Sequence, residues 1–316
     1  PVAADDGAED SGTGSSSGDA SSGTANGGVE ARKLGTPVSV ITGAEMKARQ
    51  IRHAGDALRS MPGVSVSGSG GPGQLTQVRI RGAEGNHTLV IIDGIEANDT
   101  SSGEFDFSNL SSEDIERIEV IRGGQSGLYG SRAIGGVVNI ITRGGKGPLT
   151  FRGRAEGGSF GTRDVAGGIS AGNDRGYLAA GYNFQESNGF NISTEGGEED
   201  GYERRTFNLR TGASIVEGIS VDFNLRHSRT DTEFDATNFL TPAGIPQIPV
   251  DSDNTAEKNI WMGGGRLTWD MFGGGLTHVI GGNFNDTTQS STDEFGTVTY
   301  DNGRDRFFYL GTARLS

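Results

Sequence analysis

The chain of 316 residues contains no cysteine, which excludes disulfide bonds and thiolate metal sites. It also lacks any run of about 18 apolar residues, and this excludes a transmembrane helix. Hydrophobic residues make up only 32% of the chain and the mean hydropathy is −0.43, both low for a packed globular core. A membrane-spanning β-strand is compatible with these absences, because only every second residue of such a strand must be apolar.

Positive charge is also scarce. The chain has 27 Lys and Arg residues against 41 Asp and Glu residues, a net charge of −14 that argues against a nucleic-acid-binding surface. The four histidines, at positions 53, 87, 227 and 278, have no metal-ligand spacing, and no Ser–His–Asp or Cys–His set can be recognised. We therefore expect a protein that is not an enzyme and that binds no nucleic acid.

Glycine, in contrast, is abundant, with 55 residues. Residues 1–34 form an acidic tail rich in Gly and Ser, which has too little apolar area to offset the entropy of ordering, so we expect disorder there. No basic and apolar leader opens the chain, and we expect a processed or truncated start.

Residues 35–147 combine short apolar runs with glycine turns. A capping box at Thr42 and Glu45 predicts a short helix to about Gln50, and a second helix is predicted over 54–60. A helical turn is expected at 111–114. Strands are predicted at 64–66, 77–81, 88–93, 117–121 and 137–141. The size suits one small α+β domain.

Residues 148–316 show long, strict alternation of apolar and polar residues. The pattern predicts about eight strands of 10–14 residues, which is long for soluble sheets and suitable for crossing a membrane at a tilt. Links at 172–175, 215–218 and 271–274 are expected to be tight, whereas 187–201, 231–256 and 290–302 are expected to be long polar loops. This alternation of loop lengths is typical of an outer-membrane β-barrel. The alternative is a soluble β-rich binding protein.

Seven segments of residues 35–147 follow one another in a characteristic order: PVSVIT at 37–42, DALRSMPGVSV at 56–66, VRIRG at 78–82, LVIIDGI at 89–95, IERIEVIRG at 115–123, LYGSRAIGGVVNIIT at 128–142, and an exit at 146–148. With them the region resembles the plug domain of TonB-dependent outer-membrane receptors. The nearest branch is the vitamin B12 transporter-like one, which also includes siderophore receptors.

The resemblance implies an α+β plug inside the lumen of a 22-stranded membrane β-barrel. Only about eight strands are present here, and eight open strands would leave unpaired edges in lipid, so we expect residues 148–316 to be the N-terminal portion of the barrel. It also implies a monomer in the bacterial outer membrane. Such a receptor imports cobalamin or a ferric siderophore, driven by TonB with the inner-membrane proteins ExbB and ExbD. A non-transporting ligand-binding or signalling receptor, or a passive porin, is the alternative. No TonB-pairing segment is found in residues 1–34.

The resemblance further implies roles for particular residues. Arg81 and Arg122 are expected to lock the plug to barrel glutamates, although local pairs with residues such as Glu119 would also explain them. Substrate contacts are expected at the plug apices, unless these are plain surface loops; the candidates are Gly68, Ser69, Gly70, Gln74, Asn98, Asp99 and Phe105.

Two acidic loops, 194–201 and 231–235, suggest a Ca²⁺ site. By resemblance its ligands would be Glu199, Asp200 and Asp235, and a solvated acidic loop is the alternative. We expect no other cofactor.

Overall fold

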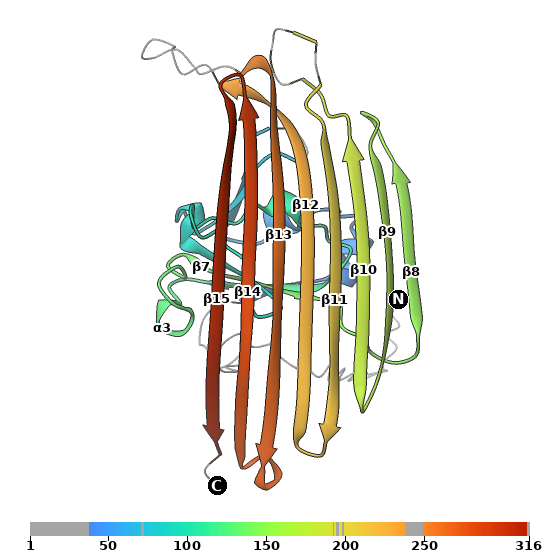
Figure 1. Ribbon diagram of the computed structural model, residues 1–316, viewed down its shortest axis with the longest axis vertical. Helices are drawn as coiled ribbons and strands as arrows, with labels where there is room; N and C mark the ends of the chain where they lie inside the picture. Colours follow the sequence, from blue (N-terminus) through green and yellow to red (C-terminus); the bar gives the residue numbers. More distant parts are fainter. Residues whose placement is uncertain are drawn as a thin grey trace, which may run out of the picture.

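The computed structural model describes residues 38–70, 73–191, 193, 196–197, 199–237 and 249–314, so the predicted disordered tail lies outside the described residues. The described chain forms an N-terminal α+β domain and a sheet of eight long strands, which we call the wall (Figure 1). The domain lies against one face of the wall near the middle of its height. Among the described residues, no helix has the length and apolar character to cross a membrane.

A five-stranded sheet organises the N-terminal domain. Its order is β1 (Val38–Thr42), β6 (Ile115–Arg122), β7 (Gly136–Thr142), β4 (Thr88–Ile92) and β5 (Ile95–Glu96). The β4–β7 pair is parallel and the other pairs are antiparallel. All five residues of β4 are buried, as its unbroken apolar run predicts. A separate hairpin is formed by β2 (Val64–Gly68) and β3 (Thr76–Ile80).

Short helices complete the domain: α1 (Gly43–Ala48), α2 (Ala54–Arg59) and α3 (Ser126–Tyr129), with 3₁₀ turns η2 (Gly85–His87) and η3 (Phe107–Asn109). The predicted N-cap of α1 is confirmed, because the Thr42 hydroxyl accepts a hydrogen bond from the Glu45 amide at 3.1 Å. The helical turn expected at 111–114 is present only as a single hydrogen-bonded turn, in which the Ile115 amide donates to the Ser112 carbonyl at 3.2 Å. A 3₁₀ turn precedes it at η3, where the Asp106 carboxylate accepts from the Ser108 amide at 2.9 Å.

The wall is fully antiparallel, and its strands pair in sequence order from β8 to β15. They are β8 (Thr150–Gly157), β9 (Arg163–Asn173), β10 (Gly176–Ser187), β11 (Tyr202–Val216), β12 (Ile219–Thr237), β13 (Pro249–Met271), β14 (Leu276–Asp293) and β15 (Gly296–Ala313). The predicted tight links after β9, β11 and β13 are confirmed; the last contains the 3₁₀ turn η4 (Phe272–Gly274).

Two of the predicted long loops are largely strand. The segment 290–302 is a hairpin, in which β14 ends at Asp293 and β15 begins at Gly296. Likewise, β12 continues to Thr237 and β13 begins at Pro249, so much of 231–256 is paired. These strand ends are polar on both faces, so they carry no apolar alternation, yet their backbones are still paired by ladder hydrogen bonds.

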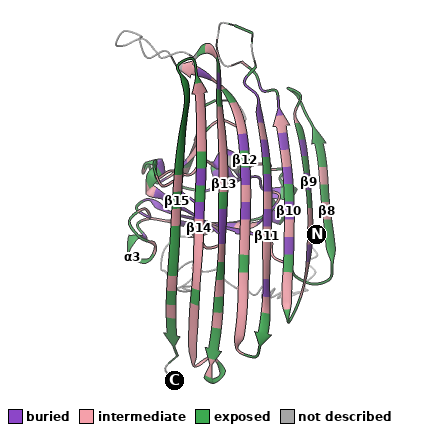
Figure 2. Ribbon diagram, viewed as in Figure 1, coloured by how far each residue is buried: buried purple, intermediate pink, exposed green. Residues whose placement is uncertain are grey.

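The two faces of the wall differ as the alternation predicts. On β10, Leu178 and Tyr182 point away from the domain and are 45% and 47% exposed, whereas Asn183 and Gln185, on the opposite face of the strand, are buried. Figure 2 shows the buried residues of the wall gathered near mid-height. The outer face is therefore apolar, and the inner face is polar and turned towards the domain.

The apolar residues of the outer face form a band. On β13 it runs from Trp261, which stacks on His227 at 4.1 Å, to Trp269, which lies 5.7 Å from His278. Eight residues separate the two tryptophans, about 26 Å along an extended strand. Charged residues begin directly beyond Trp261, at Arg229 and Glu257. Because strands of a membrane-spanning barrel tilt by about 35–45°, this length corresponds to a height of roughly 20 Å between the two tryptophans, comparable to the apolar zone of such a barrel, about 25 Å.

Candidate functional site: the interface between the N-terminal domain and the wall

Charged side chains join the domain to the wall at several points. Ion pairs connect Asp93 to Arg210 (3.2 Å), Glu96 to Arg304 (3.3 Å), Glu113 to Arg154 (3.1 Å) and Arg52 to Glu156 (2.5 Å). The domain supplies the carboxylate in three of the four pairs. Apolar contact is also present, because Met262 of the wall is buried in the main core of the domain. The interface is thus mainly polar around a small apolar contact.

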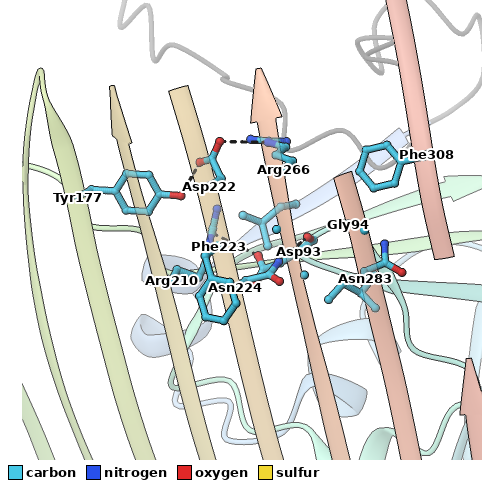
Figure 3. A pocket seen from close by; sticks show the side chains of 15 residues that line it. Asp93, Gly94, Tyr177, Arg210, Asp222, Phe223, Asn224, Arg266, Asn283 and Phe308 are labelled. Carbon is cyan, nitrogen blue, oxygen red and sulfur yellow. Dashed lines mark hydrogen bonds and ion pairs between the residues drawn. The ribbon is translucent and has the colours of Figure 1, made fainter. Parts of the chain in front are cut away.

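Asp93 forms bonds both within the plug and to the wall (Figure 3). It lies in the turn between β4 and β5, and one oxygen of its carboxylate accepts from the Thr142 amide at 3.0 Å. The same oxygen faces Arg210 of β11, and the Asp93 carbonyl accepts from the Asn224 amide group of β12 at 2.9 Å. Asp93 therefore ties one turn to the end of β7 and to two strands of the wall.

Asp114 makes a second buried connection. Its carboxylate accepts from the Asn208 side chain at 2.7 Å, and it lies over Gly181 of β10, where an added Cβ would be 2.3 Å from the carboxylate. Burial raises the pKa of Asp114, while the nearby Arg226 opposes that rise. The wall thus provides both a glycine gap and a positive charge where this carboxylate docks.

His53 lies at the start of α2, close to the wall. Burial, together with the positive charge of Arg204, lowers the pKa of its imidazole from 6.5 to about 4. His53 is therefore neutral at neutral pH, and it would be unfavourable to protonate while the domain is docked.

A cavity of about 80 Å³ separates the β4–β5 turn from the wall (Figure 3). Asp93, Gly94 and Ile95 border it on one side. On the other side are Asp222, which accepts from the Tyr177 hydroxyl at 2.8 Å and from Arg266 at 3.1 Å, and the glycines of β13. The space is large enough for several water molecules and its lining can hydrogen-bond to them.

Comparison with known proteins identifies this arrangement. Residues 30–137 match the family described as TonB-dependent Receptor Plug Domain. The chain is 32% identical over 239 residues to the vitamin B12 transporter BtuB of Photobacterium profundum, and this alignment covers 71% of the chain and 39% of that protein. The chain belongs to the TonB-dependent receptors.

Further relatives agree on the fold of this TonB-dependent receptor. BtuB of Vibrio vulnificus is 28% identical over 252 residues, covering 76% of the chain and 41% of that protein. The siderophore receptors PiuA and PirA of Acinetobacter baumannii superpose with TM-scores of 0.68 and 0.63 at 15% and 21% identity. These superpositions cover 89% and 86% of the chain and 43% and 44% of the two receptors. The chain thus spans about two-fifths of the length of the curated relatives it matches, and its fold is a plug domain with part of a barrel.

The predicted locking residues Arg81 and Arg122 lie together at one corner of the plug, on either side of Gly63. Arg81 is exposed, and Arg122 donates to the Pro62 carbonyl at 2.7 Å. Neither forms an ion pair with a carboxylate in the described part of the chain. Their locking role therefore stays a prediction.

The predicted substrate residues divide into two groups. Gly68, Ser69 and Gly70 are exposed on one apex, beside Gln74, whose amide donates to the Glu233 carbonyl of the wall at 2.7 Å.

In the other apex, Asn98 is fully buried and bonds to its own domain, and Phe105 packs edge-on against Phe107 at 4.8 Å. Burial raises the pKa of Asp99, but hydrogen bonds from Ser101 and Ser102 outweigh it and leave that pKa below its usual value. In this second apex, Asn98 and Phe105 therefore have structural contacts inside the plug.

The predicted Ca²⁺ ligands do not converge. In the described ranges, no three His, Cys, Asp or Glu side chains are grouped so as to hold a metal ion. Asp235 accepts instead from the amides of Ser193 and Ser252, at 3.0 and 3.1 Å, while Glu199 is exposed and Asp200 is buried. The grouping of Glu199, Asp200 and Asp235 expected from the sequence is thus not found, and Ca²⁺ binding by these loops stays a prediction.

Sequence reasoning missed the docking residues of the plug and their partners: Asp93, Glu96, Glu113, Asp114, Arg154, Asn208, Arg210 and Arg304. In the wall strands the sequence does indicate contact with the plug, because arginine and asparagine occupy inward positions of the alternation. In the plug the sequence evidence for this contact is weak, since LVIIDGI is also the pattern of an ordinary strand and turn. The pairing between the two became evident only from the docked arrangement.

Proposed function

We propose that this chain is part of an outer-membrane receptor that imports cobalamin or a ferric siderophore by TonB-coupled active transport. The observation that carries the proposal is the plug docked on the polar inner face of the wall. Contacts such as Asp93–Arg210 and Asp114–Asn208 join polar groups that can hydrogen-bond to water when the plug and the wall separate, unlike the groups of a large apolar interface. A plug held in this way suits a gate that must be moved and restored.

The choice of ligand class rests on the relatives. Two curated relatives are named vitamin B12 transporters, and the solved structures of similar fold include siderophore receptors and a ferric enterobactin receptor of Pseudomonas aeruginosa. The sequence match is nearer to the vitamin B12 transporters, whereas the siderophore receptors share the fold at 21% identity or less. Cobalamin is therefore the first ligand to test.

Placement in the outer membrane is supported by the apolar band between Trp261 and Trp269. Its height fits a lipid bilayer, and it has aromatic rings at both edges, with His278 and Tyr309 stacked at 5.9 Å beside the lower tryptophan. The partner of the outer face would therefore be membrane lipid.

For energy we propose coupling to TonB, with ExbB and ExbD, which draws on the proton gradient of the inner membrane. The support is membership of the TonB-dependent receptors. A TonB-pairing segment would be expected before β1, and residues 1–37 lie outside the described residues.

We place ligand contact at the exposed apex formed by Gly68, Ser69, Gly70 and Gln74, and at the second apex through Asp99 and Phe105, which are partly exposed, and not through the buried Asn98. Gln74 contacts Glu233 near the end of β12 that carries the long links, so the first apex faces the loop side of the wall. Replacing Ser69 and Gln74 by alanine should weaken ligand binding without unfolding the plug. A ligand-bound structure with no contact from either apex would remove this assignment.

The deciding experiment is uptake by the full-length receptor in cells that lack their own cobalamin and siderophore receptors. Labelled cyanocobalamin and a ferric siderophore are supplied in parallel, with and without a protonophore. Uptake of one ligand that stops with the protonophore supports active import. Ligand binding without uptake would favour a signalling receptor, and uptake unaffected by the protonophore would favour a passive porin.

Two finer proposals have their own tests. If Arg81 and Arg122 lock the plug, the Arg81→Ala variant should admit large antibiotics into cells that exclude them otherwise. If the acidic loops bind Ca²⁺, calorimetric titration of the full-length receptor should give at least millimolar affinity, which Asp235→Asn should reduce.

A further inference from the structure

The weakest strand of the plug sheet is the one that faces the wall. β5 has only two residues and pairs with β4 at two positions, Ile91 with Glu96 and Ile92 with Ile95. It lies at the edge of the five-stranded sheet, next to β13 and β14. The Glu96 carbonyl accepts from Asn285 at 3.1 Å, and the Glu96 carboxylate pairs with Arg304 at 3.3 Å. Contacts with the wall thus hold this strand as much as its own sheet does.

The turn that begins β5 is held by Asp93. Asp93 and Gly94 both have positive φ, 48° and 90°, as in the tight two-residue turns of hairpins. The Asp93 side chain is 10% exposed, and it contacts Arg210, which is 21% exposed. Leaving one charge of such a sheltered ion pair without its partner costs free energy. We therefore expect the turn either to stay in contact with the wall or to separate from it completely.

The cavity lies directly beside this turn, and its mixed lining includes polar groups from both the plug and the wall. The Oδ1 atom of Asn224 is buried and has no partner in the described part of the chain, although the Asn224 amide group bonds to Asp93. On the wall side, Gly264, Gly265 and Gly282 present no side chains to the space. Movement of β5 away from the wall would therefore enlarge a gap that already has polar groups on both sides, together with the rings of Tyr177, Phe223 and Phe308.

We propose that the β4–β5 turn with β5 is a flap, that Asp93–Arg210 is its latch, and that the cavity beside it is the closed beginning of the passage past the plug. The proposal rests on the proposed function of import. Opening the flap moves Ile95, which is 4% exposed, out of the core, so the closed state is the resting state. The remainder of the sheet, including fully buried β4, stays in place.

The first test measures access to the cavity. These 316 residues contain no cysteine, so Asn283→Cys would place the single thiol of this part of the receptor in the lining of the cavity. In the full-length receptor this thiol should react with a small polar methanethiosulfonate about tenfold faster when Asp93→Asn or Arg210→Gln is added, as expected for a latch worth ~1.4 kcal/mol. Arg210→Gln leaves the bonds between Asp93 and Thr142 intact, so it separates the latch from the fold of the plug.

The matched control is Glu156→Gln, which breaks the ion pair to Arg52 at another edge of the plug. This variant should leave the rate of labelling unchanged. Equal rates in the parent protein and in both latch variants would overturn the flap, and so would equal acceleration by Glu156→Gln.

The second test fixes the flap to the wall. Cysteines at Glu96 and Asn285 would be joined by a disulfide or a short bifunctional thiol reagent, verified by mass spectrometry, and compared with cysteines at Arg52 and Glu156. The first cross-link should abolish uptake of cobalamin until it is reversed, and the second should not. Uptake through a receptor with a fixed flap, or loss of uptake with either cross-link, would refute the proposal. If the uncross-linked receptor transports neither ligand, the proposed function fails. The labelling rates would still show whether the flap opens when the latch is weakened.

Discussion

At the scale of single residues, the docked plug depends on protonation states that differ from those of the free side chains. His53 has a pKa of about 4 in the folded protein against 6.5 in an unfolded chain, so the unfolded state binds the extra proton as the pH falls below 6.5. Stability is complete above pH 6.5 and decreases as the pH falls towards 4. At pH 5 the loss should be about 2 kcal/mol.

Calorimetry of the full-length receptor in detergent, at pH 7 and pH 5, measures this difference as a shift of the unfolding transition of the plug. The pKa of His53 is also shifted by the charges of neighbouring side chains, which are Arg204, Asp56, Asp164 and Arg154. The proton whose binding destabilises the fold is nevertheless bound by His53 itself. His53→Gln should remove most of the difference between the two pH values, and His278→Gln, on the outer face of the wall, should keep it. A transition equally sensitive to pH in His53→Gln would contradict this prediction.

Asn98 illustrates a residue whose role is structural although it was predicted to bind substrate. Its side chain accepts from the Val90 amide at 2.7 Å and donates to the carbonyls of Thr88 and Gly103, both at 2.9 Å. Because all three backbone groups would lose their partner, Asn98→Ala should destabilise the plug by about 2–4 kcal/mol. Urea denaturation of the receptor checks this, with the exposed Asn86→Ala as a near-neutral control.

The sequence predicted single residues least well. The loop that contains Asn98, Asp99 and Phe105 is rich in polar residues, which is typical of an exposed loop. In the structure Asn98 is completely buried. Asp93 was predicted as the end of a strand and Asp114 as part of a helical turn, because a carboxylate with a local role and one that docks against a distant side chain look alike in sequence. Their partners lie far along the chain: Asp114 and Asn208 are 94 residues apart. No local pattern can express such a pairing.

At the scale of elements, the upper part of the wall carries an unfavourable arrangement of charge. Glu186, Glu203, Asp231 and Glu257 lie directly opposite one another on the four adjacent strands β10 to β13. Like charges opposite each other destabilise a sheet. Arg205 and Arg229 offset this only in part, since both are about half exposed.

Reversing the central charge of this row should therefore stabilise the wall. Glu203→Lys places a positive charge between Glu186 and Asp231, at the loss of the exposed pair with Arg205. We expect a gain of roughly 0.5 kcal/mol at low salt that largely disappears at 1 M salt. Thermal unfolding at the two salt concentrations measures it. Glu217→Lys, in an exposed turn, is the matched control, and an equal gain there would rule out the opposing charges as the cause.

Elements were predicted well where the alternation of apolar and polar residues was complete. The number and order of the eight wall strands, α1 and the buried β4 agree with their sequence patterns, but the predicted strand length of 10–14 residues is wrong for most of the wall, since β11 to β15 have 15 to 23 residues and β8 has 8. The exceptions are the segments 231–256 and 290–302, in which Ser, Thr, Asp and Glu occupy both faces. Pairing there is decided by backbone hydrogen bonds between neighbouring strands, such as β14 with β15, and not by burial of apolar side chains.

At the scale of the whole molecule, the wall separates an apolar exterior from a polar interior. Leu178 lies in the same row as Thr211, Phe223 and Gly265, in the middle of the apolar band. In a lipid bilayer Leu178→Arg should cost about 2–4 kcal/mol, whereas Asn259→Arg, just beyond Trp261, should cost at most about 1 kcal/mol.

Equilibrium unfolding from lipid vesicles compares these two variants. The difference should shrink when the receptor is studied in short-chain detergent, which adapts to a charged side chain more easily than a bilayer does. Equal costs in vesicles would mean that the outer face is not embedded as the band indicates.

The order in which the wall strands pair also bears on assembly. Every strand from β8 to β15 pairs with its neighbour in sequence, so each hairpin closes a short loop. The contacts between plug and wall, in contrast, join residues as far apart as Glu96 and Arg304, 208 positions along the chain. Short closures form fast and distant ones slowly. Newly made wall strands should therefore pair with one another first, and the plug should dock against them afterwards. In the interval between these two steps the charged inner face of the wall would be accessible to chaperones, proteases and water.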